Sequence, residues 1–458
     1  MPIMEPYRIK VVEPIPITTP EQRRRAMERA GYNQFNLSAD EVTIDLLTDS
    51  GTNAVSAAQL AAGIDGDETY AGSRSWHRFR QAVGDLMNYE HILPAHQGRA
   101  AERILFTALL KPGQMSVSNT HFDTTRANVA LLGCEPRDLP CREAADLDSP
   151  APFKGNIDLD ALREVLSGPE RERVGLVLMT VTNNGGGGQP VSMANLIATR
   201  ELCRQFGVPL FLDAARFAEN AWLVTQREEG YRDHTPRQVA QAMFALADGC
   251  VASLKKDGIA HIGAVLAFND DRLADICQLH VIASEGFLTY GGMTGRDLDM
   301  LAQGLAEVTD PLYLRARASM TEYLAEVVDA AGVTIVRPPG IHALYLNAGR
   351  LLPHLRPDQF PGHGLACELY LQGGIRCAEL GSLYLAEIDD DGTVRNSPPH
   401  ELVRLAVPRR VYTQTHLEYV GEVLAKIAKH PERVPGYRLT KNPQVLRPFH
   451  CRLEPITS

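Results

Sequence analysis

The chain has 458 residues, of which 44% are hydrophobic and 22% charged. A single core seldom grows beyond roughly 250–300 residues, so this length indicates two packed domains and the composition excludes a disordered or fibrous chain. The net charge is −10 and no Lys/Arg cluster is interleaved with aromatic residues, which argues against nucleic acid or an anionic membrane as a partner. The short run of arginines at 23–25 is expected on the solvated face of an N-terminal helix.

The eight cysteines form no CxxC pair and lie in apolar patterns, which is typical of reduced core thiols in a cytoplasmic protein. The longest apolar runs, such as residues 174–181, are far shorter than the ~20 residues that span a bilayer. The N-terminal segment offers no apolar stretch for a signal sequence. We therefore expect a cytoplasmic protein without a transmembrane helix.

The chain divides into three parts by pattern. Residues 1–47 combine a proline-stiffened arm, of the kind that often embraces a neighbouring subunit, with part of a small domain. Residues 48–310 alternate short β-rich runs with helical segments, which predicts a large domain with a mostly parallel sheet flanked by helices. Residues 311–458 predict a smaller α+β domain, with strands at 333–336 and 342–346 and helices at 314–331 and 414–428.

A βαβ unit is predicted over residues 174–213. The apolar run at 174–182 is followed by a helix that opens near Ser192 and ends before Gly207, and then by a second buried strand that ends at Asp213. Ligands of open α/β sheets bind beyond the carboxyl ends of the strands, which makes Asp213 a candidate. Taken alone, an aspartate here also fits a simple helix cap.

A lysine pair follows the next predicted strand. After a helix at 236–247 and a strand at 250–253 come Lys255 and Lys256, and a further apolar strand at 262–268. A carboxylate and an amine at neighbouring strand ends are what pyridoxal phosphate needs, because the acid keeps the pyridine nitrogen protonated and the amine binds the aldehyde. A structural ion pair is the alternative.

A glycine turn opens an amphipathic helix at residues 96–105, HQGRAAERIL. Free amides at a helix start suit a phosphate group. Many helices begin after a glycine, so this signal gains weight only beside Asp213 and Lys256.

With these residues in view, nearly the whole chain resembles the β-eliminating lyases of aromatic amino acids, tryptophanase and tyrosine phenol-lyase. The resemblance lies in nine segments, which begin at residues 44 (IDLLTDSGTN), 66 (GDETYAGS), 96 (HQGR), 122 (FDTT), 187 (GGQPVSMAN), 213 (DAARFAENA), 253 (SLKKD), 290 (YGG) and 403 (VRL). It implies the fold of type I pyridoxal-phosphate transferases, with a seven-stranded, mostly parallel sheet in the large domain.

The resemblance also implies the roles of single residues. Lys256 forms the covalent link to the cofactor and later removes the α-proton, Asp213 pairs with the pyridinium, and Phe122 stacks on the ring. The remaining implied cofactor contacts are Gln97, Gly98, Arg99, Ser253 and Lys255 around the phosphate, with Asn184 and Arg216 at the phenolic oxygen. Arg404 grips the substrate carboxylate as a bidentate fork.

Three further expectations follow from the same resemblance. Tyr70 acts as general acid on the leaving group across a subunit interface, with a core tyrosine as the alternative. A monovalent cation, usually potassium, binds to Glu68 and to the carbonyls of Gly51 and His261. The assembly is a homo-oligomer, a tetramer built from dimers that share active sites.

The leaving group is less sharply indicated. The resemblance makes Asp123 a catalytic and substrate-binding residue, because an acid at this position can hold the indole N–H. Asp123 and Leu380 both favour tryptophanase, since the phenol-lyases carry threonine and arginine at these positions. Pro448 replaces a histidine of tryptophanases, and Gly185, Gly186 and Leu288 also depart from the family near the substrate. An S-substituted cysteine or tyrosine therefore stays open as the substrate, as does an aminotransferase or aldolase reaction on the same fold. A cofactor-binding protein without turnover would be expected to lose Lys256, Tyr70 or Arg404.

Overall fold

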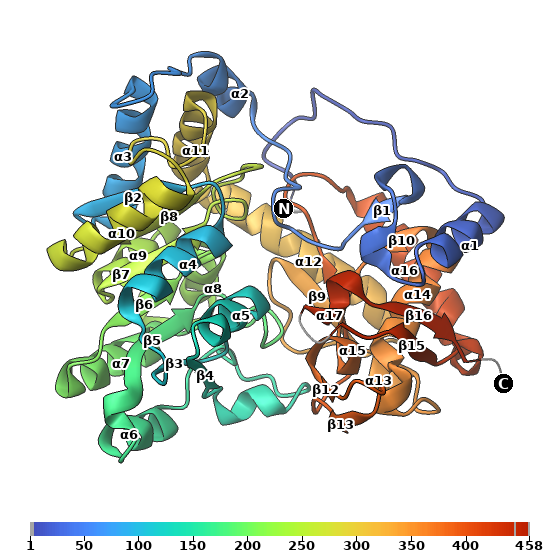
Figure 1. The fold of residues 1–458 in the computed structure, drawn as a ribbon. Coiled ribbons are helices and arrows are strands. Elements are labelled where there is room, and N and C mark those ends of the chain that lie inside the picture. Colours follow the sequence, from blue (N-terminus) through green and yellow to red (C-terminus); the bar gives the residue numbers. More distant parts are fainter. Residues whose placement is uncertain (1–3, 444–445, 457–458) are drawn as a thin grey trace. The chain divides into compact units, whose positions relative to one another are not determined.

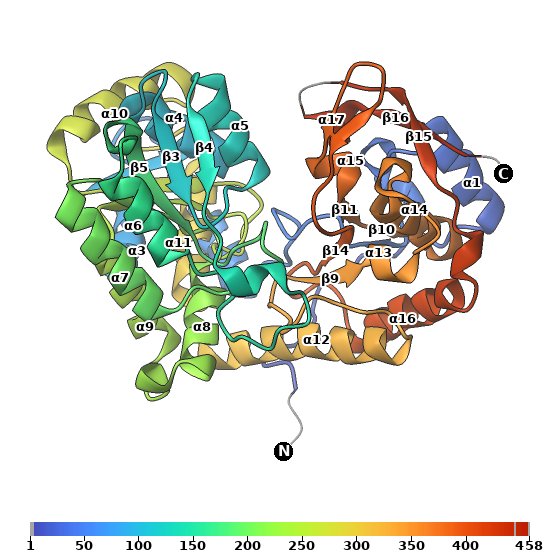
Figure 2. The same cartoon turned by 90° about the horizontal axis from the view of Figure 1, so that it is seen from below.

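The computed structural model describes residues 4–443 and 446–456 (Figures 1 and 2). It contains two compact units. The first comprises Ser50–Arg317 together with the described residues up to Pro6, and the second comprises Tyr7–Asp49 and Ala318–Ser458. The long helix α12 (Pro311–Ala330) runs from the end of the first unit into the second.

A seven-stranded sheet forms the centre of the first unit, with the strand order β2-β8-β7-β6-β5-β3-β4. Only β8 (Ala264–Phe268) runs antiparallel to its neighbours. The predicted mostly parallel sheet is therefore confirmed. The other strands are β2 (His91–Ala95), β3 (Met115–Ser118), β4 (Glu135–Asp138), β5 (Val174–Thr180), β6 (Leu210–Asp213) and β7 (Gly249–Ser253).

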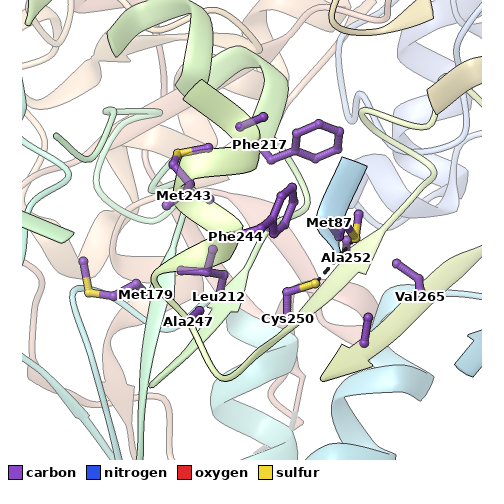
Figure 3. Close-up of a cluster of buried hydrophobic side chains, with 14 of the residues drawn as sticks. Met87, Met179, Leu212, Phe217, Met243, Phe244, Ala247, Cys250, Ala252 and Val265 are labelled. Atoms are coloured by element: carbon purple, nitrogen blue, oxygen red, sulfur yellow. Dashed lines mark hydrogen bonds between the residues drawn. The ribbon is translucent and has the colours of Figure 1, made fainter. Parts of the chain in front are cut away.

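Helices cover both faces of this sheet. Side chains alternate along each strand, so both faces carry apolar side chains that helices bury. Leu176, Leu178 and Phe211 face one hydrophobic cluster, which α4 and α10 complete. Val177, Met179 and Leu212 face the other, which contains residues of α3, α7, α8 and α9. Part of that second cluster is drawn in Figure 3. The helices of this unit are α2 (Ala57–Ile64), α3 (Arg74–Met87), α4 (Gly98–Leu109), α5 (Asp123–Leu131), α6 (Leu159–Ser167), α7 (Met193–Phe206), α8 (Phe217–Arg227), α9 (Pro236–Ala245), α10 (Asp271–Ser284) and α11 (Gly295–Glu307).

The predicted βαβ unit forms as expected. Ser192 caps α7, since its hydroxyl accepts a hydrogen bond from the amide of Asn195 at 3.1 Å. Gly207 ends the helix in the left-handed conformation, with φ at 65°, which a glycine adopts at little cost. Both ends of the helix were therefore readable from local chemistry.

The second unit is built on the three-stranded antiparallel sheet β11-β14-β9. Residues of α12, α14 and α16 pack with this sheet into one hydrophobic cluster. The elements of the unit besides α12 are α1 (Pro20–Arg29), β1 (Ile44–Asp45), β9 (Ala343–Asn347), α13 (Ala348–Leu351), α14 (Pro361–Gly373), β10 (Ile375–Arg376), β11 (Ala378–Leu380), α15 (Ser382–Leu385), β12 (Glu387–Ile388), β13 (Val394–Asn396), β14 (Leu402–Ala406), α16 (Gln414–Ala428), β15 (Tyr437–Lys441), α17 (Arg447–His450) and β16 (Arg452–Pro455).

Two local predictions are wrong. Residues 333–336 form no strand, and only Ile335 makes an isolated bridge, to Leu346. Two prolines follow at 338 and 339, and proline lacks the amide donor that a longer ladder needs. Of the arginines predicted on a solvated face, Arg24 and Arg25 are exposed, but Arg23 is buried, and its guanidinium donates to the carbonyls of Leu371 and Gln372 at 2.8 and 2.9 Å.

The predicted core thiols are confirmed. All eight cysteines are free, seven are buried and Cys141 is half-buried. Among the helices of the described residues, none combines the length and the hydropathy that a bilayer crossing requires.

Candidate active site

The carboxyl ends of the parallel strands lie together at one edge of the seven-stranded sheet. The strands β5, β6 and β7 are neighbours, with Thr180 opposite Asp213 and Asp213 opposite Val251. Asp213 ends β6 and Ser253 ends β7. The loops after these strands therefore converge where ligands of open α/β sheets bind.

A pocket lies at this edge. All ten residues that the sequence predicts as cofactor contacts line it: Gln97, Gly98, Arg99, Phe122, Asn184, Asp213, Arg216, Ser253, Lys255 and Lys256. The lining is completed by Ser50, Glu102, Thr124, Thr180, Val181, Thr182, Ala215 and Val251. The fold thus gathers the ten positions, while their roles toward the cofactor stay predictions.

Asp213 presents a buried carboxyl to the pocket, with 8% of its surface exposed. Burial raises the pKa of this carboxyl, and the positive charges of Lys256 and Arg216 act against that rise. A buried acid beside cations is suited to hold a proton on a ring nitrogen.

Lys256 lies in the turn after β7, where its Nζ donates to the hydroxyl of Ser253 at 3.0 Å. The next residue, Asp257, is buried and accepts hydrogen bonds from the amides of Ala218 and Glu219 at 2.7 and 3.3 Å. This anchors the turn to the start of α8. The amine of Lys256 is therefore held at the pocket by the residues on either side of it.

The helix α4 begins at the pocket with Gly98. The amides of Ala100 and Ala101 bond to the carbonyl of Gln97 at 3.1 and 3.3 Å, and the Gln97 side chain, within the described chain, makes no capping hydrogen bond. Gly98 and Arg99 come before these two residues in the helix, and their amides are available to an anion such as phosphate. A Cβ atom at Gly98 would lie 2.7 Å from the Cβ of Ser253, so a side chain there would force a wall of the pocket to move.

The other walls carry the ring-facing candidates. Phe122 precedes α5, Asn184 follows β5, and Arg216 precedes α8. Beside them the hydroxyl oxygen of Thr182 is buried and has no hydrogen-bond partner among the described residues. Buried polar atoms are rarely left unpaired, so this wall suits a polar ligand.

Taken together, the pocket fits pyridoxal phosphate. Lys256 offers an amine for the aldehyde, Asp213 a buried acid for the ring nitrogen, and the start of α4 free amides for the phosphate. The unpaired hydroxyl of Thr182 leaves a further hydrogen bond to be made.

Glu102 is the main pocket residue that sequence reasoning missed. In an amphipathic helix a glutamate is expected at the solvated face, whereas the structure exposes only 7% of Glu102. Burial and the negative charge of Asp213 raise the pKa of Glu102 to about 7. The available signal was its spacing, because a residue four positions after Gly98 lies on the same face of the helix.

Two predicted catalytic residues lie outside the pocket lining. Tyr70 is 67% exposed, and its ring packs on Phe287 and Tyr290 with centroids 5.4 and 5.3 Å apart. The adjacent Tyr290 phenol raises the pKa of Tyr70. Asp123 begins α5, and its carboxylate accepts a hydrogen bond from the amide of Thr124 at 2.6 Å.

The predicted cation ligands are brought together only in part. A Cβ atom at Gly51 would lie 3.0 Å from the carbonyl oxygen of His261, so these two backbone segments are in contact. Glu68 instead accepts a hydrogen bond from the amide of Gly295 at 2.9 Å, at the start of α11.

The predicted substrate contacts of the second unit lie on three elements. Arg404 is in the central strand β14, and its guanidinium donates to the carbonyl of Leu47 at 3.2 Å. Leu380 ends β11. Pro448 lies in α17, where its carbonyl accepts a hydrogen bond from Asn33 at 2.9 Å.

Comparison with known proteins agrees with this geometry. The family model described as "Beta-eliminating lyase" matches residues 45–423. A tryptophanase of Hyphomonas neptunium is 50% identical over 452 residues, 99% of each chain, and a tyrosine phenol-lyase of Pasteurella multocida is 42% identical over 452 residues, 98% of each. The solved structure of Leishmania major threonine aldolase shares the fold, with a TM-score of 0.58 over 84% of this chain and 99% of that one, at 15% identity.

Proposed function

The chain belongs to the β-eliminating lyase family, and from this we propose that it cleaves L-tryptophan to indole, pyruvate and ammonia. The family makes it a pyridoxal-phosphate-dependent lyase. The higher identity to a tryptophanase, 50% against 42% for a tyrosine phenol-lyase, supports indole as the leaving group. The proposal is carried by the pocket that joins Lys256 to Asp213.

When bound, pyridoxal phosphate supplies an electron-accepting ring for the charge that develops at the substrate α-carbon. In the proposed mechanism Asp213 holds a proton on the ring nitrogen. Lys256 would hold the cofactor through its aldehyde, and its amine is the base that would take the α-proton of the substrate. Its hydrogen bond to Ser253, at 3.0 Å, supports this role by orienting the amine.

The family resemblance supplies the proposed cofactor contacts, and the pocket supports them because all of these residues line it. Phe122 stacks on the ring, and Asn184 and Arg216 bind its phenolic oxygen. The phosphate is held by Gln97, Gly98, Arg99, Ser253 and Lys255. Burial and the charge of Arg99 lower the pKa of Lys255.

The substrate contacts complete the proposal. Arg404 binds the α-carboxylate as a planar fork. Asp123 accepts the indole N–H, and Tyr70 donates the proton that converts the indole carbon into a leaving group. The 67% exposure of Tyr70 supports a site that is completed by a second subunit. Leu380 and Pro448 line the side-chain pocket.

Three properties of the assembled enzyme belong to the proposal. The chain forms a tetramer built from dimers that share active sites. Potassium binds to the carbonyls of Gly51 and His261, whose backbone segments are in contact, and to Glu68. If the enzyme is equally active with tetramethylammonium as the only cation, the proposed potassium site is contradicted. The eight free thiols suit a reducing compartment, the cytoplasm, which cell fractionation tests.

The experiment that tests the substrate compares kcat/KM for L-tryptophan, L-tyrosine and S-methyl-L-cysteine, with pyruvate as the common product. We expect tryptophan to give the highest value. S-methylcysteine is the informative third substrate, because its thiolate leaves without protonation of a ring carbon. Negligible turnover of tryptophan beside rapid turnover of S-methylcysteine would replace the indole proposal by a cysteine-conjugate lyase.

A further inference from the structure

Glu102 is a buried carboxyl in the wall of the pocket, and the proposed function gives it no role. It lies in the second turn of α4 and shares the pocket with Asp213 and Lys256. A carboxyl with 7% exposure loses most of its hydration, which is costly unless hydrogen bonds replace it. Its partners therefore show what it is built to hold.

Those partners all come from α5. Thr125 donates its hydroxyl to Glu102 at 2.7 Å, Asn128 donates its amide at 3.2 Å, and Thr124 approaches at 3.5 Å. Asn128 also donates to the carbonyl of Arg99 at 3.3 Å. The carboxyl of Glu102 thus joins the start of α5 to the start of α4.

We propose that Glu102 is a positioning residue of the cofactor pocket. It holds the first turn of α5, and with it Phe122, against the first turn of α4 with Gly98. The distance between the Phe122 side chain, which stacks on the ring, and the phosphate-binding amides of α4 is then fixed. This distance matches the separation of ring and phosphate in pyridoxal phosphate. This inference rests on the proposed function, because that separation matters only if pyridoxal phosphate binds.

The charge of Glu102 gives the proposal a measurable signature. The charged groups that face it are Asp213 from β6 and Lys256 from the turn after β7. The side chains of α5 that face Glu102 are uncharged. The cluster that α4 shares with β8 and α10 is hydrophobic. Because its pKa is raised to about 7, Glu102 is neutral in mildly acidic solution and adds a second negative charge beside Asp213 above pH 7.

The affinity for the anionic cofactor should therefore fall as pH rises through 7 in proteins that carry Glu102. Glu102→Gln keeps the neutral form at every pH, and it retains an oxygen that accepts from Thr125. Glu102→Ala removes the acceptor and leaves the α5 donors unpaired. Glu201→Gln, at an exposed position of α7, is the matched control.

The experiment titrates each apoprotein with pyridoxal phosphate at pH 6 and pH 8.5 and follows the visible absorbance. Wild type and Glu102→Gln should bind equally at pH 6, and wild type should bind about 3- to 10-fold more weakly than Glu102→Gln at pH 8.5, since one pKa unit corresponds to a tenfold change. Glu102→Ala should lose about tenfold in affinity at both pH values. Glu201→Gln should follow wild type throughout.

A wild-type to Glu102→Gln ratio that is the same at both pH values would overturn the inference, as would wild-type affinity in Glu102→Ala. Should Glu102→Ala fail to fold, as judged by circular dichroism, the glutamine arm still decides. If wild type binds no pyridoxal phosphate, the proposed function itself fails, which separates the two outcomes.

Discussion

The two adjacent lysines of the pocket lie in different surroundings. The Cε atom of Lys255 lies against Gly51, where an added Cβ would be 2.6 Å from it. Lys256 instead reaches the hydroxyl of Ser253 and acts electrostatically on Asp213. The proposed function therefore assigns the carboxylate and the amine of the reaction to Asp213 and Lys256, and the phosphate contact to Lys255.

Lys256→Ala should lower the rate of pyruvate release by at least about 10²–10⁴-fold, because it removes both the cofactor link and the proton acceptor. Lys255→Ala, the neighbouring change, should weaken cofactor binding and yet keep turnover at saturating cofactor. A coupled assay for pyruvate measures both variants. Turnover that survives in Lys256→Ala and vanishes in Lys255→Ala would exchange the two roles.

The sequence could predict the pocket residues that follow strand ends or belong to family motifs, such as Asp213, Gln97 and Lys256. Thr182, which ends the apolar run at 174–182, carries the same strand-end signal. For Glu102 the only signal was its spacing from Gly98, because a helical glutamate carries the pattern of a solvated residue and its place depends on packing against α5, which is distant in sequence. Burial, which no local pattern encodes, makes the difference.

Among the helices, the start of α4 is the most constrained by the pocket. Gly98→Ala places a methyl group 2.7 Å from the Cβ of Ser253. Relieving such an overlap typically costs about 1–3 kcal/mol, so cofactor affinity should fall by about tenfold or more. Gly84→Ala in α3 is the control, because its methyl group would meet nothing closer than Ile92 at 4.0 Å. Equal affinities in the two variants would show that the phosphate turn is not packed as described.

In the second unit, two buried carboxyls hold the short helix α15. Glu379 accepts a hydrogen bond from the amide of Leu383 at 3.2 Å, and Glu401 accepts from Ser382. Burial, and after it the charge of Glu401, raises the pKa of Glu379 well above its usual range. The helix that follows Leu380 is therefore held by an acid that prefers to be protonated.

This raised pKa makes the stability of the fold depend on pH. The unfolded chain ionises Glu379 near the ordinary value of about 4.3, so the stabilisation is complete below that pH and is lost as pH rises toward the folded-state pKa. Glu379→Gln, which stays neutral, should gain stability relative to wild type as pH rises from 5 to 8. Urea unfolding at the two pH values measures it, with the exposed Glu387→Gln as control. A difference that does not change with pH would contradict the assignment.

Elements with local signals were predicted well. Both ends of α7 follow from a capping serine and a left-handed glycine, and the predicted helix at 414–428 has the bounds of α16, Gln414–Ala428. The antiparallel direction of β8 could not be predicted, because a strand buried on both faces has the same apolar pattern in either direction. The strand predicted at residues 333–336 does not form for a related reason. Whether a segment pairs with β9 depends on its neighbours in the sheet and not on its own β-propensity.

For the whole molecule, the shared fold with a threonine aldolase at 15% identity does not decide the chemistry, whereas the pocket residues and the family match do. Because Tyr70 is exposed, its proposed role as general acid requires an assembly of at least two subunits. Its partner site would be supplied by a second subunit, which an experiment on mixed subunits addresses.

Tyr70→Phe and Lys256→Ala, each inactive alone, should restore activity when they are unfolded together and reassembled. Random pairing makes half of the dimers hybrids with one intact site of two, so about a quarter of the wild-type rate is expected. The double variant Tyr70→Phe/Lys256→Ala, reassembled with itself, is the control. Hybrids that form, as seen by native mass spectrometry, and yet remain inactive would place Tyr70 and Lys256 in the same subunit's site.

The most direct measurement of the central claim is borohydride reduction of the enzyme loaded with pyridoxal phosphate, followed by peptide mass mapping. Reduction converts the bond between cofactor and lysine into a stable amine, so the labelled side chain is identified. The pocket geometry predicts a pyridoxyl group on Lys256 in wild type and a loss of that label in Lys256→Ala. A label on another lysine, or none at all, would contradict the account.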